Sequence, residues 1–423
     1  MTFKIITLGC KVNIYESEVM KEKLLQAGFK ETIDNSDIVI INTCSVTNMA
    51  DVKSRKMIRR EKKENPQSIL IVCGCSAENH RLELEDLGID ILIGNKDKSN
   101  IVSLIREYQN GHKPIIKFYD TRKLPFEDME VDKFTSHTRG FIKIQDGCNN
   151  YCSYCIIPYV RGNIRSKDIN VALKEAQELV ANNHKEIVLT GIHTGSYGVG
   201  YDFDLVDLIN KMSTIPGLKR IRLSSIEITE LNDKFMELLK NNTILCDHLH
   251  IPLQSGSKKI LKLMNRKYDK SRYESIINQI RAIRPEISIT TDVIVGFPGE
   301  TESDFNECLD FCRKIKYAKI HVFPYSKREG TKAASMPNQL DNKTKKDRAR
   351  KLIELSNELE EAYNQKFLGR NMDVLVEEYK DSCSIGHTSN YLKVVIETKV
   401  PTNEFYNVKI TKTSSSEVTG KIN

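Results

Sequence analysis

Short apolar runs alternate with amphipathic stretches along most of the chain, and this alternation limits the folds that are open to it. In the first hundred residues, helical patterns such as YESEVMKEKLLQAG separate the runs FKIITLG, DIVIIN, SILIV and IDILIG. Strands that alternate with helices are typical of β-α units in a parallel sheet. We therefore expect a parallel α/β domain over residues 1–112.

A second series of β-α units follows a linker. Residues 111–137 lose the alternation and contain prolines and many charges. From residue 139 the apolar runs return as GFIKIQ, EIVLTG, KRIRLSS, DHLHIPL, ISITTDVIVG and AKIHVF. Six such units predict a β/α partial barrel over residues 136–365, because the closed form of this barrel has eight.

The end of the chain has a third pattern. After a charged helical run near 340–367, the segments DVLVEEY, YLKVVIE and FYNVKIT alternate with period two. This pattern predicts a small antiparallel β module over residues 366–423. The fold class is therefore α/β, with three domains.

Composition indicates the compartment. The chain has 423 residues, 39% of them hydrophobic and 29% charged, and it contains no apolar run of membrane-spanning length. Its first residues, MTFKIITLGC, do not resemble a signal segment. We expect a cytoplasmic protein with no membrane partner, in which clustered cysteines bind metal or take part in redox chemistry.

Three of the eleven cysteines share the polar stretch QDGCNNYCSYC. Cys148, Cys152 and Cys155 are separated by three and two residues, and the Gly, Asn and Ser around them predict a loop. Buried cysteines often only fill space, but three thiols on a short loop indicate a ligand set. Cys308 and Cys312, by contrast, are predicted to pack in the core on one face of a helix.

Cysteines also follow three strands of the first domain. Cys10, Cys44 and Cys75 come after predicted strands whose carboxyl ends border one crevice, where open parallel sheets bind ligands. We expect these thiols to meet, although three separately buried cysteines are an alternative. Between Cys73 and Cys75 we choose Cys75, because its neighbours Gly74 and Ser76 indicate a loop tip.

Two sets of three thiolates favour iron–sulfur clusters. Structural zinc takes four ligands, and catalytic zinc sites are rich in His and Glu. Iron–sulfur clusters take cysteine thiolates, normally four. A cluster with three cysteine ligands would leave one iron open to bind another group.

The spacing at Cys148, Cys152 and Cys155, after the first strand of a partial barrel, resembles the radical-SAM superfamily. Nearly the whole chain is similar to the methylthiotransferases of that superfamily. The motifs are LGCKVNIYESE, INTCSVT, CGCSAE, TGIHTGSYG, RLSSIE, HLHIPLQSGS, MNRKY, TTDVIVGFPGETE and HVFPYSKREGT. The terminal module falls where this family carries its TRAM domain, a small RNA-binding barrel.

The resemblance implies cofactors and partners. Cys148, Cys152 and Cys155 would hold a 4Fe-4S cluster whose open iron chelates S-adenosylmethionine, and Cys10, Cys44 and Cys75 would hold an auxiliary 4Fe-4S cluster. S-adenosylmethionine would serve both as radical source and as methyl donor. Partners would be tRNA, a sulfur donor and a reductant such as flavodoxin or ferredoxin.

The motifs LGCKVN and TGIHTGSYG resemble the branch that methylthiolates carbon 2 of N6-threonylcarbamoyladenosine at position 37 of tRNA. The alternatives are isopentenyladenosine in tRNA, a ribosomal-protein side chain, and a non-catalytic iron–sulfur RNA-binding regulator. A threonylcarbamoyl group carries a carboxylate, for which Arg165 and Arg266 are the candidate partners.

Further residues are assigned with the resemblance in view. Expected contacts of the cofactor are Tyr154, Gly191, Ser225, Gln254 and Gly296, although packing and turn formation are alternatives for each. The segment 53–63 has a surplus of six positive charges, so Arg55, Arg59 and Arg60 are expected to contact tRNA phosphates rather than only water. The terminal domain adds little to this charge, with eight Lys and Arg against seven Asp and Glu.

Overall fold

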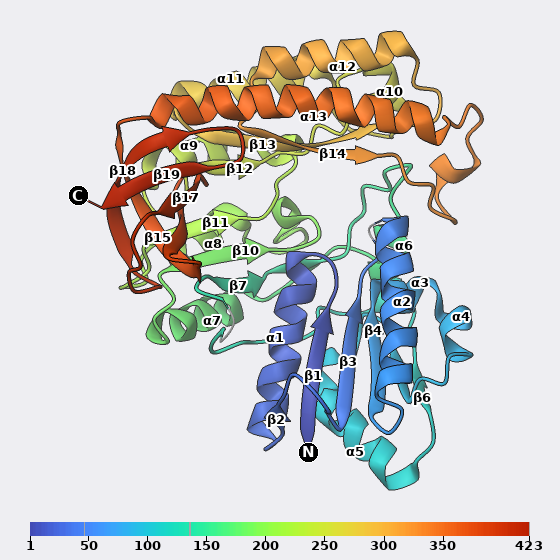
Figure 1. The fold of residues 1–423 in the computed structure, drawn as a ribbon. Helices are drawn as coiled ribbons and strands as arrows, with labels where there is room; N and C mark the ends of the chain where they lie inside the picture. The colour runs from blue at the N-terminus through green and yellow to red at the C-terminus, as the bar shows by residue number, and fades with distance from the viewer. Residues whose placement is uncertain (46, 135–136, 423) are drawn as a thin grey trace.

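The computed structural model describes residues 1–45, 47–134 and 137–422. It has an N-terminal parallel sheet, a central partial barrel and a small C-terminal barrel (Figure 1). No helix in the described part of the chain is long and apolar enough to cross a membrane.

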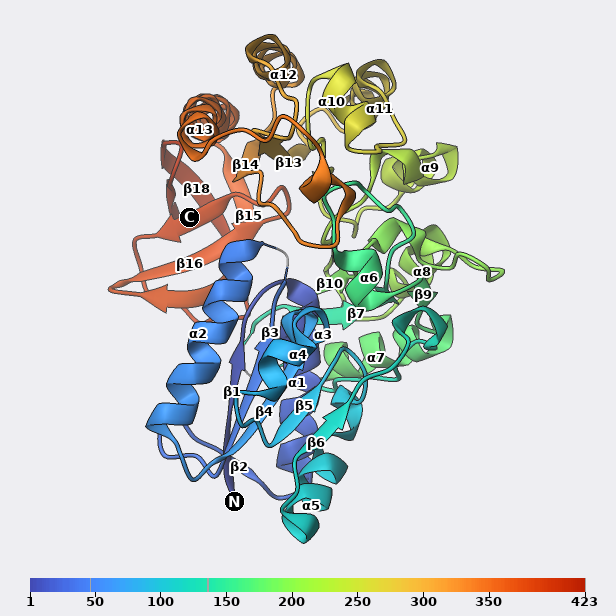
Figure 2. The same ribbon diagram turned by 90° about the vertical axis from the view of Figure 1, so that its right-hand side faces the viewer.

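The N-terminal sheet is fully parallel, as predicted, with the strand order β2-β1-β3-β4-β5-β6. Its strands are β1 (Thr2–Thr7), β2 (Lys30–Glu31), β3 (Ile38–Thr43), β4 (Ile69–Gly74), β5 (Ile91–Ile93) and β6 (Ile115–Lys117). The helices α1 (Lys11–Gln26) and α5 (Ile101–Gly111) pack on one face. The helices α2 (Asn48–Glu64), α3 (Cys75–Asn79) and α4 (Arg81–Glu85) cover the other face (Figure 2).

The predicted linker is not wholly irregular. Ile115–Lys117 form β6, which pairs in parallel with β5 at the edge of the N-terminal sheet. The sequence pattern did not show this strand because its two isoleucines, flanked by Pro114 and Lys117, do not form an apolar run. The sheet therefore extends beyond residue 112.

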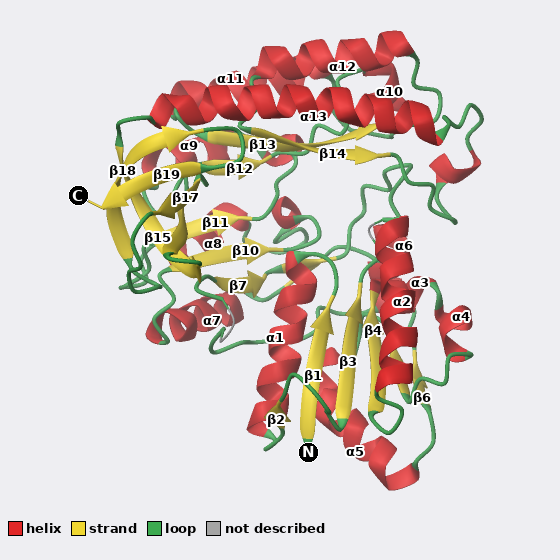
Figure 3. Cartoon of the chain, viewed as in Figure 1, coloured by secondary structure: helices red, strands yellow, loops and turns green. Residues whose placement is uncertain are grey.

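All six strands predicted for the central part are present: β7 (Gly140–Lys143), β10 (Glu186–Thr190), β11 (Arg220–Leu223), β12 (His248–His250), β13 (Ser288–Val295) and β14 (Lys319–Pro324). They form two parallel three-stranded sheets, joined by an isolated bridge between Ile221 and Leu245. Helices cover the outside (Figure 3), and they are α7 (Ile169–Ala181), α8 (Leu205–Met212), α9 (Asp233–Asn241), α10 (Lys258–Leu263), α11 (Lys270–Ile283), α12 (Glu302–Ile315) and α13 (Asn342–Asn364). Cys308 and Cys312 lie in the core as predicted.

The C-terminal module is a closed five-stranded barrel. Its strands are β15 (Asn371–Lys380), β16 (Cys383–Thr388), β17 (Lys393–Ile396), β18 (Phe405–Thr413) and β19 (Val418–Ile422). Four of its five pairings are antiparallel, but β17 and β19 run parallel. An odd number of strands cannot alternate in direction around a closed ring, so the prediction of an entirely antiparallel module is wrong for this pair.

Candidate functional site

A cavity of about 970 Å³ lies between the three parts of the chain. The start of α1, the loop around residues 148–157, the barrel strands and turns of the C-terminal barrel form its walls. Cys10, Cys148, Cys152 and Cys155 all line it. One cysteine of the N-terminal set and all three loop cysteines therefore border one cavity, at the strand ends where β/α barrels bind ligands.

The cysteines of QDGCNNYCSYC lie on a loop after β7, and each is partly exposed. The backbone N–H of Cys148 donates to the Gly162 carbonyl, and that of Cys155 donates to the Cys152 carbonyl, both at 3.0 Å. Burial, together with the nearby Cys152 and Cys148, raises the pKa of the Cys155 thiol to about 12. The three thiols are thus close neighbours, and metal binding would release their protons.

Two cations accompany this loop. Arg266 donates from Nη1 to Cys152 Sγ at 3.2 Å and is paired with Glu227. His193 Nδ1 lies 4.0 Å from Cys148 Sγ. Burial acts to lower the pKa of His193, but Cys148 and Glu230 raise it to about 10. Positive charge next to a thiol favours the thiolate, which is the form that binds iron.

Cys10, Cys44 and Cys75 follow the neighbouring strands β1, β3 and β4. The glycines before Cys10 and Cys75 have positive φ angles, 113° at Gly9 and 100° at Gly74. A Cβ on Gly9 would lie 2.7 Å from Cys44 Sγ, and a Cβ on Gly74 would lie 2.5 Å from the Thr43 carbonyl oxygen. Only glycine fits these turns, and the turn at Gly9 brings the chain before Cys10 against Cys44.

Arg161 connects this N-terminal set to the loop of the other set. It ends the short helix α6 (Ile157–Arg161), which follows Cys155 closely, and its side chain is fully buried. Its Nε donates to Cys75 Sγ at 3.1 Å, and its Nη1 donates to Glu16 at 2.9 Å. The same guanidinium donates to Asn13 Oδ1 at 3.1 Å, and Asn13 in turn bridges the ends of β1 and β3.

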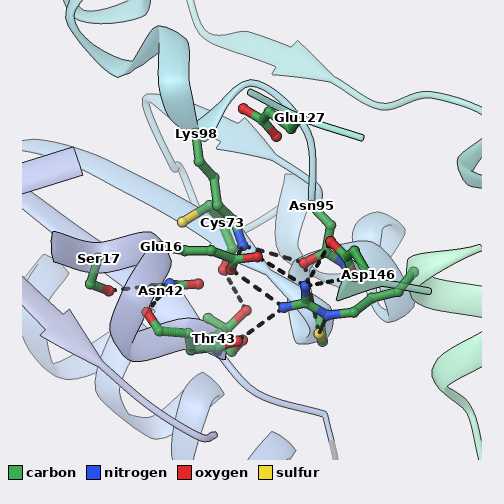
Figure 4. Close-up of polar contacts among 12 residues, drawn as sticks. Glu16, Ser17, Asn42, Thr43, Cys73, Asn95, Lys98, Glu127 and Asp146 are labelled. Carbon is green, nitrogen blue, oxygen red and sulfur yellow. Dashed lines mark hydrogen bonds and ion pairs between the residues drawn. The ribbon is translucent and has the colours of Figure 1, made fainter. Parts of the chain in front are cut away.

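Glu16 on α1 lies at the centre of a buried charge network (Figure 4). Lys98, Lys143 and Arg161 all pair with it. Burial acts to raise the pKa of Glu16, but these three cations hold it well below its usual range. Asp146, which pairs with Arg161 and Lys143, is the second carboxylate. Three buried cations thus face two buried carboxylates, and a thiolate or other anion at Cys75 would complete the charge balance.

Cys73 has a different environment. It lies within β4, is 0% exposed and belongs to the hydrophobic core between the sheet and its helices. Burial raises the pKa of its thiol to about 12. Cys75 is the first residue of α3 rather than part of a loop tip, because the turn at Gly74 leads directly from strand to helix. The expectation of a loop was wrong, although Cys75 rather than Cys73 accepts the hydrogen bond from Arg161.

The donor sets fit clusters better than single ions. No group of three or more Cys, His, Asp and Glu side chains among residues 1–45, 47–134 and 137–422 converges to hold one metal ion. A zinc site requires such convergence, whereas each thiolate of a four-iron cluster binds a different iron. Three neighbouring thiols with a cation donating to one of them fit such a cluster, whose sulfur ligands accept hydrogen bonds.

Most residues expected to contact the cofactor lie on the cavity. Its lining includes Tyr154, Gly191, Ser225, Gln254 and Arg266. Gln254 has a φ of 66°, in the left-handed region that is uncommon for non-glycine residues. Tyr154 packs edge-on against Phe297. These positions come from different strand ends, so the fold rather than local sequence brings them together.

Two of the expected residues lie outside the cavity lining. Gly296 donates its N–H to Glu300 at 2.8 Å and abuts Lys345 of α13. Arg165 donates to the Thr121 carbonyl and lies 3.5 Å from Asp146. Gly296 thus serves helix packing and Arg165 belongs to the edge of the buried charge network.

The three arginines of segment 53–63 lie on α2, outside the cavity lining. Arg55 pairs with Glu83 at 3.6 Å, and Arg60 pairs with Glu64 at 2.9 Å. Arg59 is exposed. Part of the apparent charge surplus is therefore neutralised by acidic neighbours that the segment itself does not contain.

The sequence analysis missed Arg161, Glu16, His193 and Lys11. Arg161 and Lys11 had a local signal, since each follows a predicted ligand cysteine within a few residues. Glu16 had none, because its partner Arg161 is 145 residues away in the sequence. Only the packing of two domains brings that pair together.

Comparisons with known proteins agree with this geometry. Residues 142–312 match the Radical SAM superfamily, and residues 2–94 match "Uncharacterized protein family UPF0004". The chain is 41% identical to the threonylcarbamoyladenosine tRNA methylthiotransferase MtaB of Bacillus subtilis (strain 168), over 96% of this chain and 93% of the relative. It is 36% identical to the tRNA-2-methylthio-N(6)-dimethylallyladenosine synthase of Clostridium tetani, over 99% of this chain and 96% of the relative.

Solved structures share the fold. The radical S-adenosylmethionine methyltransferase TsrM of Kitasatospora setae, with cobalamin and a [4Fe-4S] cluster bound, superposes with a TM-score of 0.57 at 14% identity. The match covers 79% of this chain and 76% of that one. At this identity the likeness concerns the arrangement of the domains and not the reaction.

Proposed function

Because the chain belongs to the radical-SAM methylthiotransferases, we propose that it methylthiolates carbon 2 of N6-threonylcarbamoyladenosine next to the anticodon of tRNA. Membership of this family brings S-adenosylmethionine and four-iron four-sulfur clusters as cofactors. When bound, they supply reductive cleavage of S-adenosylmethionine to a radical that abstracts hydrogen from an unactivated carbon, chemistry that side chains cannot perform.

The residues would divide this work between two sites. Cys148, Cys152 and Cys155 would hold the cluster that binds S-adenosylmethionine, with Arg266 donating to one ligand. Cys10, Cys44 and Cys75 would hold the auxiliary cluster, with Arg161 donating to Cys75. The remaining partners would be a reductant such as flavodoxin or ferredoxin and a sulfur donor.

The observation that carries the proposal is the shared cavity. A methylthio transfer needs the target carbon close to both a radical source and a sulfur source. Cys10 and the three loop cysteines line the same space of about 970 Å³, which is large enough for a nucleoside together with a small cofactor. Separate pockets for the two sets would have argued against this chemistry.

The choice of substrate rests on the relatives, on two motifs and on the charges of the cavity. The relatives include enzymes named for threonylcarbamoyladenosine, at up to 41% identity, and others named for dimethylallyladenosine, at 36%. The motifs LGCKVN and TGIHTGSYG favour the first group. Charged side chains on the cavity, among them Lys11 and Lys319, also suit a substituent with a carboxylate better than an apolar isopentenyl chain.

The test is a direct comparison of three tRNAs. The full-length protein, reconstituted without oxygen, is incubated with S-adenosylmethionine, a reductant, sulfide and tRNA that carries threonylcarbamoyladenosine, isopentenyladenosine or plain adenosine. Mass spectrometry of the nucleosides should detect a methylthio product only with the first. Methylthio-isopentenyladenosine as the main product would refute the proposed substrate, and so would the absence of a methylthio product on all three tRNAs.

A further inference from the structure

The cavity extends beyond the two cysteine sets to the C-terminal barrel. Its far wall includes Lys11, His248, His387 and Tyr391. Lys11 is the first residue of α1 and directly follows Cys10. A group bound at this wall would therefore lie next to the proposed auxiliary site.

Lys11 stands out because it lines the cavity without a protein partner among the described residues. It is partly buried, and it forms no hydrogen bond or ion pair with any residue in the described parts of the chain. An ammonium group without a partner in a cavity is costly unless a ligand supplies the negative charge.

Tyr391 lines the same cavity and is packed among three other side chains. The ring stacks on His387 at 4.7 Å and on His248 at 4.8 Å between centroids, and the guanidinium of Arg222 lies 4.6 Å from its centre. Its φ is 67°, a strained value for a tyrosine. Strain of this kind persists where surrounding contacts fix a side chain for function.

The charges around this wall leave a positive excess. The cations are Lys11, Arg139, Arg220 and Arg222, and the carboxylates are Glu186 and Glu377. Glu186 pairs with Arg222 and Arg220, and Glu377 pairs with Arg139 and His387. Burial acts to raise the pKa of Tyr391, but Arg139, Lys11 and Arg222 lower it overall. The phenol thus lies in a field that attracts anions.

We propose that Lys11 and Tyr391 form the subsite that binds the carboxylate of the substituent on the target base. This inference rests on the proposed function, in which the substituent is a threonylcarbamoyl group. The two residues predicted for this role are already engaged, since Arg165 lies at Asp146 and Arg266 is paired with Glu227. The ammonium of Lys11 would pair with the carboxylate of the substituent, and the hydroxyl of Tyr391 would hydrogen-bond with its neighbouring hydroxyl.

Lys11 and Tyr391 could bind a tRNA phosphate through the same contacts as a carboxylate. The experiment therefore compares a tRNA that has the carboxylate with one that lacks it. Dissociation constants are measured for one tRNA with threonylcarbamoyladenosine and for the same tRNA with plain adenosine. The proteins are the full-length wild type, Lys11→Gln, Lys11→Arg and Tyr391→Phe. Lys21→Gln is the matched control, because Lys21 lies on the same helix and pairs with Glu31. Iron content and tRNA-independent cleavage of S-adenosylmethionine verify that each variant is folded and loaded.

Lys11→Gln should weaken binding of the modified tRNA by about tenfold to a hundredfold, the range for a lost hydrogen bond to a charged group. It should leave binding of the unmodified tRNA unchanged. Lys11→Arg should restore most of the loss, and Tyr391→Phe should show a smaller loss of the same kind.

Equal losses on both tRNAs would assign Lys11 to a phosphate and overturn the inference, as would no loss on either. A wild type that binds both tRNAs equally and methylthiolates neither would instead refute the proposed function. Retained preference for the modified tRNA in Lys11→Gln would refute the carboxylate subsite alone.

Discussion

The two cysteine sets differ in what surrounds them. Cys148, Cys152 and Cys155 lie together on one loop, are partly exposed and face the cavity. Cys44 and Cys75 are buried at strand ends, and Cys75 receives a hydrogen bond from the fully buried Arg161. The loop cysteines and Cys10 are open to a ligand, whereas Cys75 is held by an arginine from another domain. We therefore expect the exchangeable cofactor at the loop and a permanent group at the sheet.

The largest expected effect is at the loop. Cys152→Ala should abolish reductive formation of 5′-deoxyadenosine and remove about half of the iron, because two thiolates cannot hold a cluster with an open iron. Chromatography of the reaction and iron analysis after anaerobic reconstitution measure both quantities. Undiminished 5′-deoxyadenosine would contradict the role of this loop.

Cys75→Ala should separate the two sites. We expect it to keep cleavage of S-adenosylmethionine while losing the methylthio product, since the loop cysteines remain intact. Cys73→Ala is the matched control, because Cys73 is buried in the core and has no arginine donor. It should lose about 1 kcal/mol or more of stability through the small cavity it creates, but retain product. The reverse behaviour of the two variants would mean that Cys73 is the ligand.

Arg161→Gln should change iron binding only at the strand-end cysteines Cys10, Cys44 and Cys75. It leaves Glu16 and Asp146 with one cation fewer, so the free energy of unfolding should fall by about 3–5 kcal/mol, as for other broken buried pairs. Iron bound at the strand-end cysteines should be released about tenfold to a hundredfold faster, which is the usual effect of losing a hydrogen bond to a metal ligand.

Arg161→Lys keeps the charge and should recover much of the stability. Arg165→Gln removes a more distant neighbour of the same Asp146 and should cost less. Denaturant unfolding and the rate of iron release to a chelator measure both properties. Equal losses from Arg161→Gln and Arg165→Gln would show that Arg161 has no special relation to Cys75.

Much of the fold follows from the sequence because apolar periodicity is a local property. All six strands of the partial barrel and four of the six strands in the first sheet were predicted from it. β2 and β6 were not, because β2 has no apolar residue and β6 has only two, so neither forms an apolar run.

In the candidate sites, too, residues with a local sequence signal were predicted and residues brought together by packing were not. Local spacing identified the loop cysteines, and topology identified the strand-end cysteines. The contacts of Arg161 with Cys75 and Glu16 could not be predicted, because these residues meet only through the packing of separate domains. Arg165 was predicted to bind the carboxylate of the substrate because it is charged, but it already pairs with Asp146.

The smallest expected effect is at the three arginines of α2, which lie outside the cavity lining. Replacing Arg55, Arg59 and Arg60 by Gln should weaken tRNA binding modestly and reduce its salt dependence by about one unit of slope per lost phosphate contact. Two of the three already pair with glutamates, which limits the effect. Arg81→Gln, which removes a similar pair on α4, is the control. An unchanged slope in the triple variant would mean that this face of α2 contacts only water.

Iron and sulfide analysis of the reconstituted protein tests most directly whether two different cysteine sets each hold a cluster. The wild type should contain about eight irons and eight sulfides per chain, and Cys152→Ala and Cys75→Ala should each contain about four. Mössbauer spectra of the two variants should differ, because each retains the cluster that the other has lost. A wild type with only about four irons, or two variants with the same residual spectrum, would contradict the account.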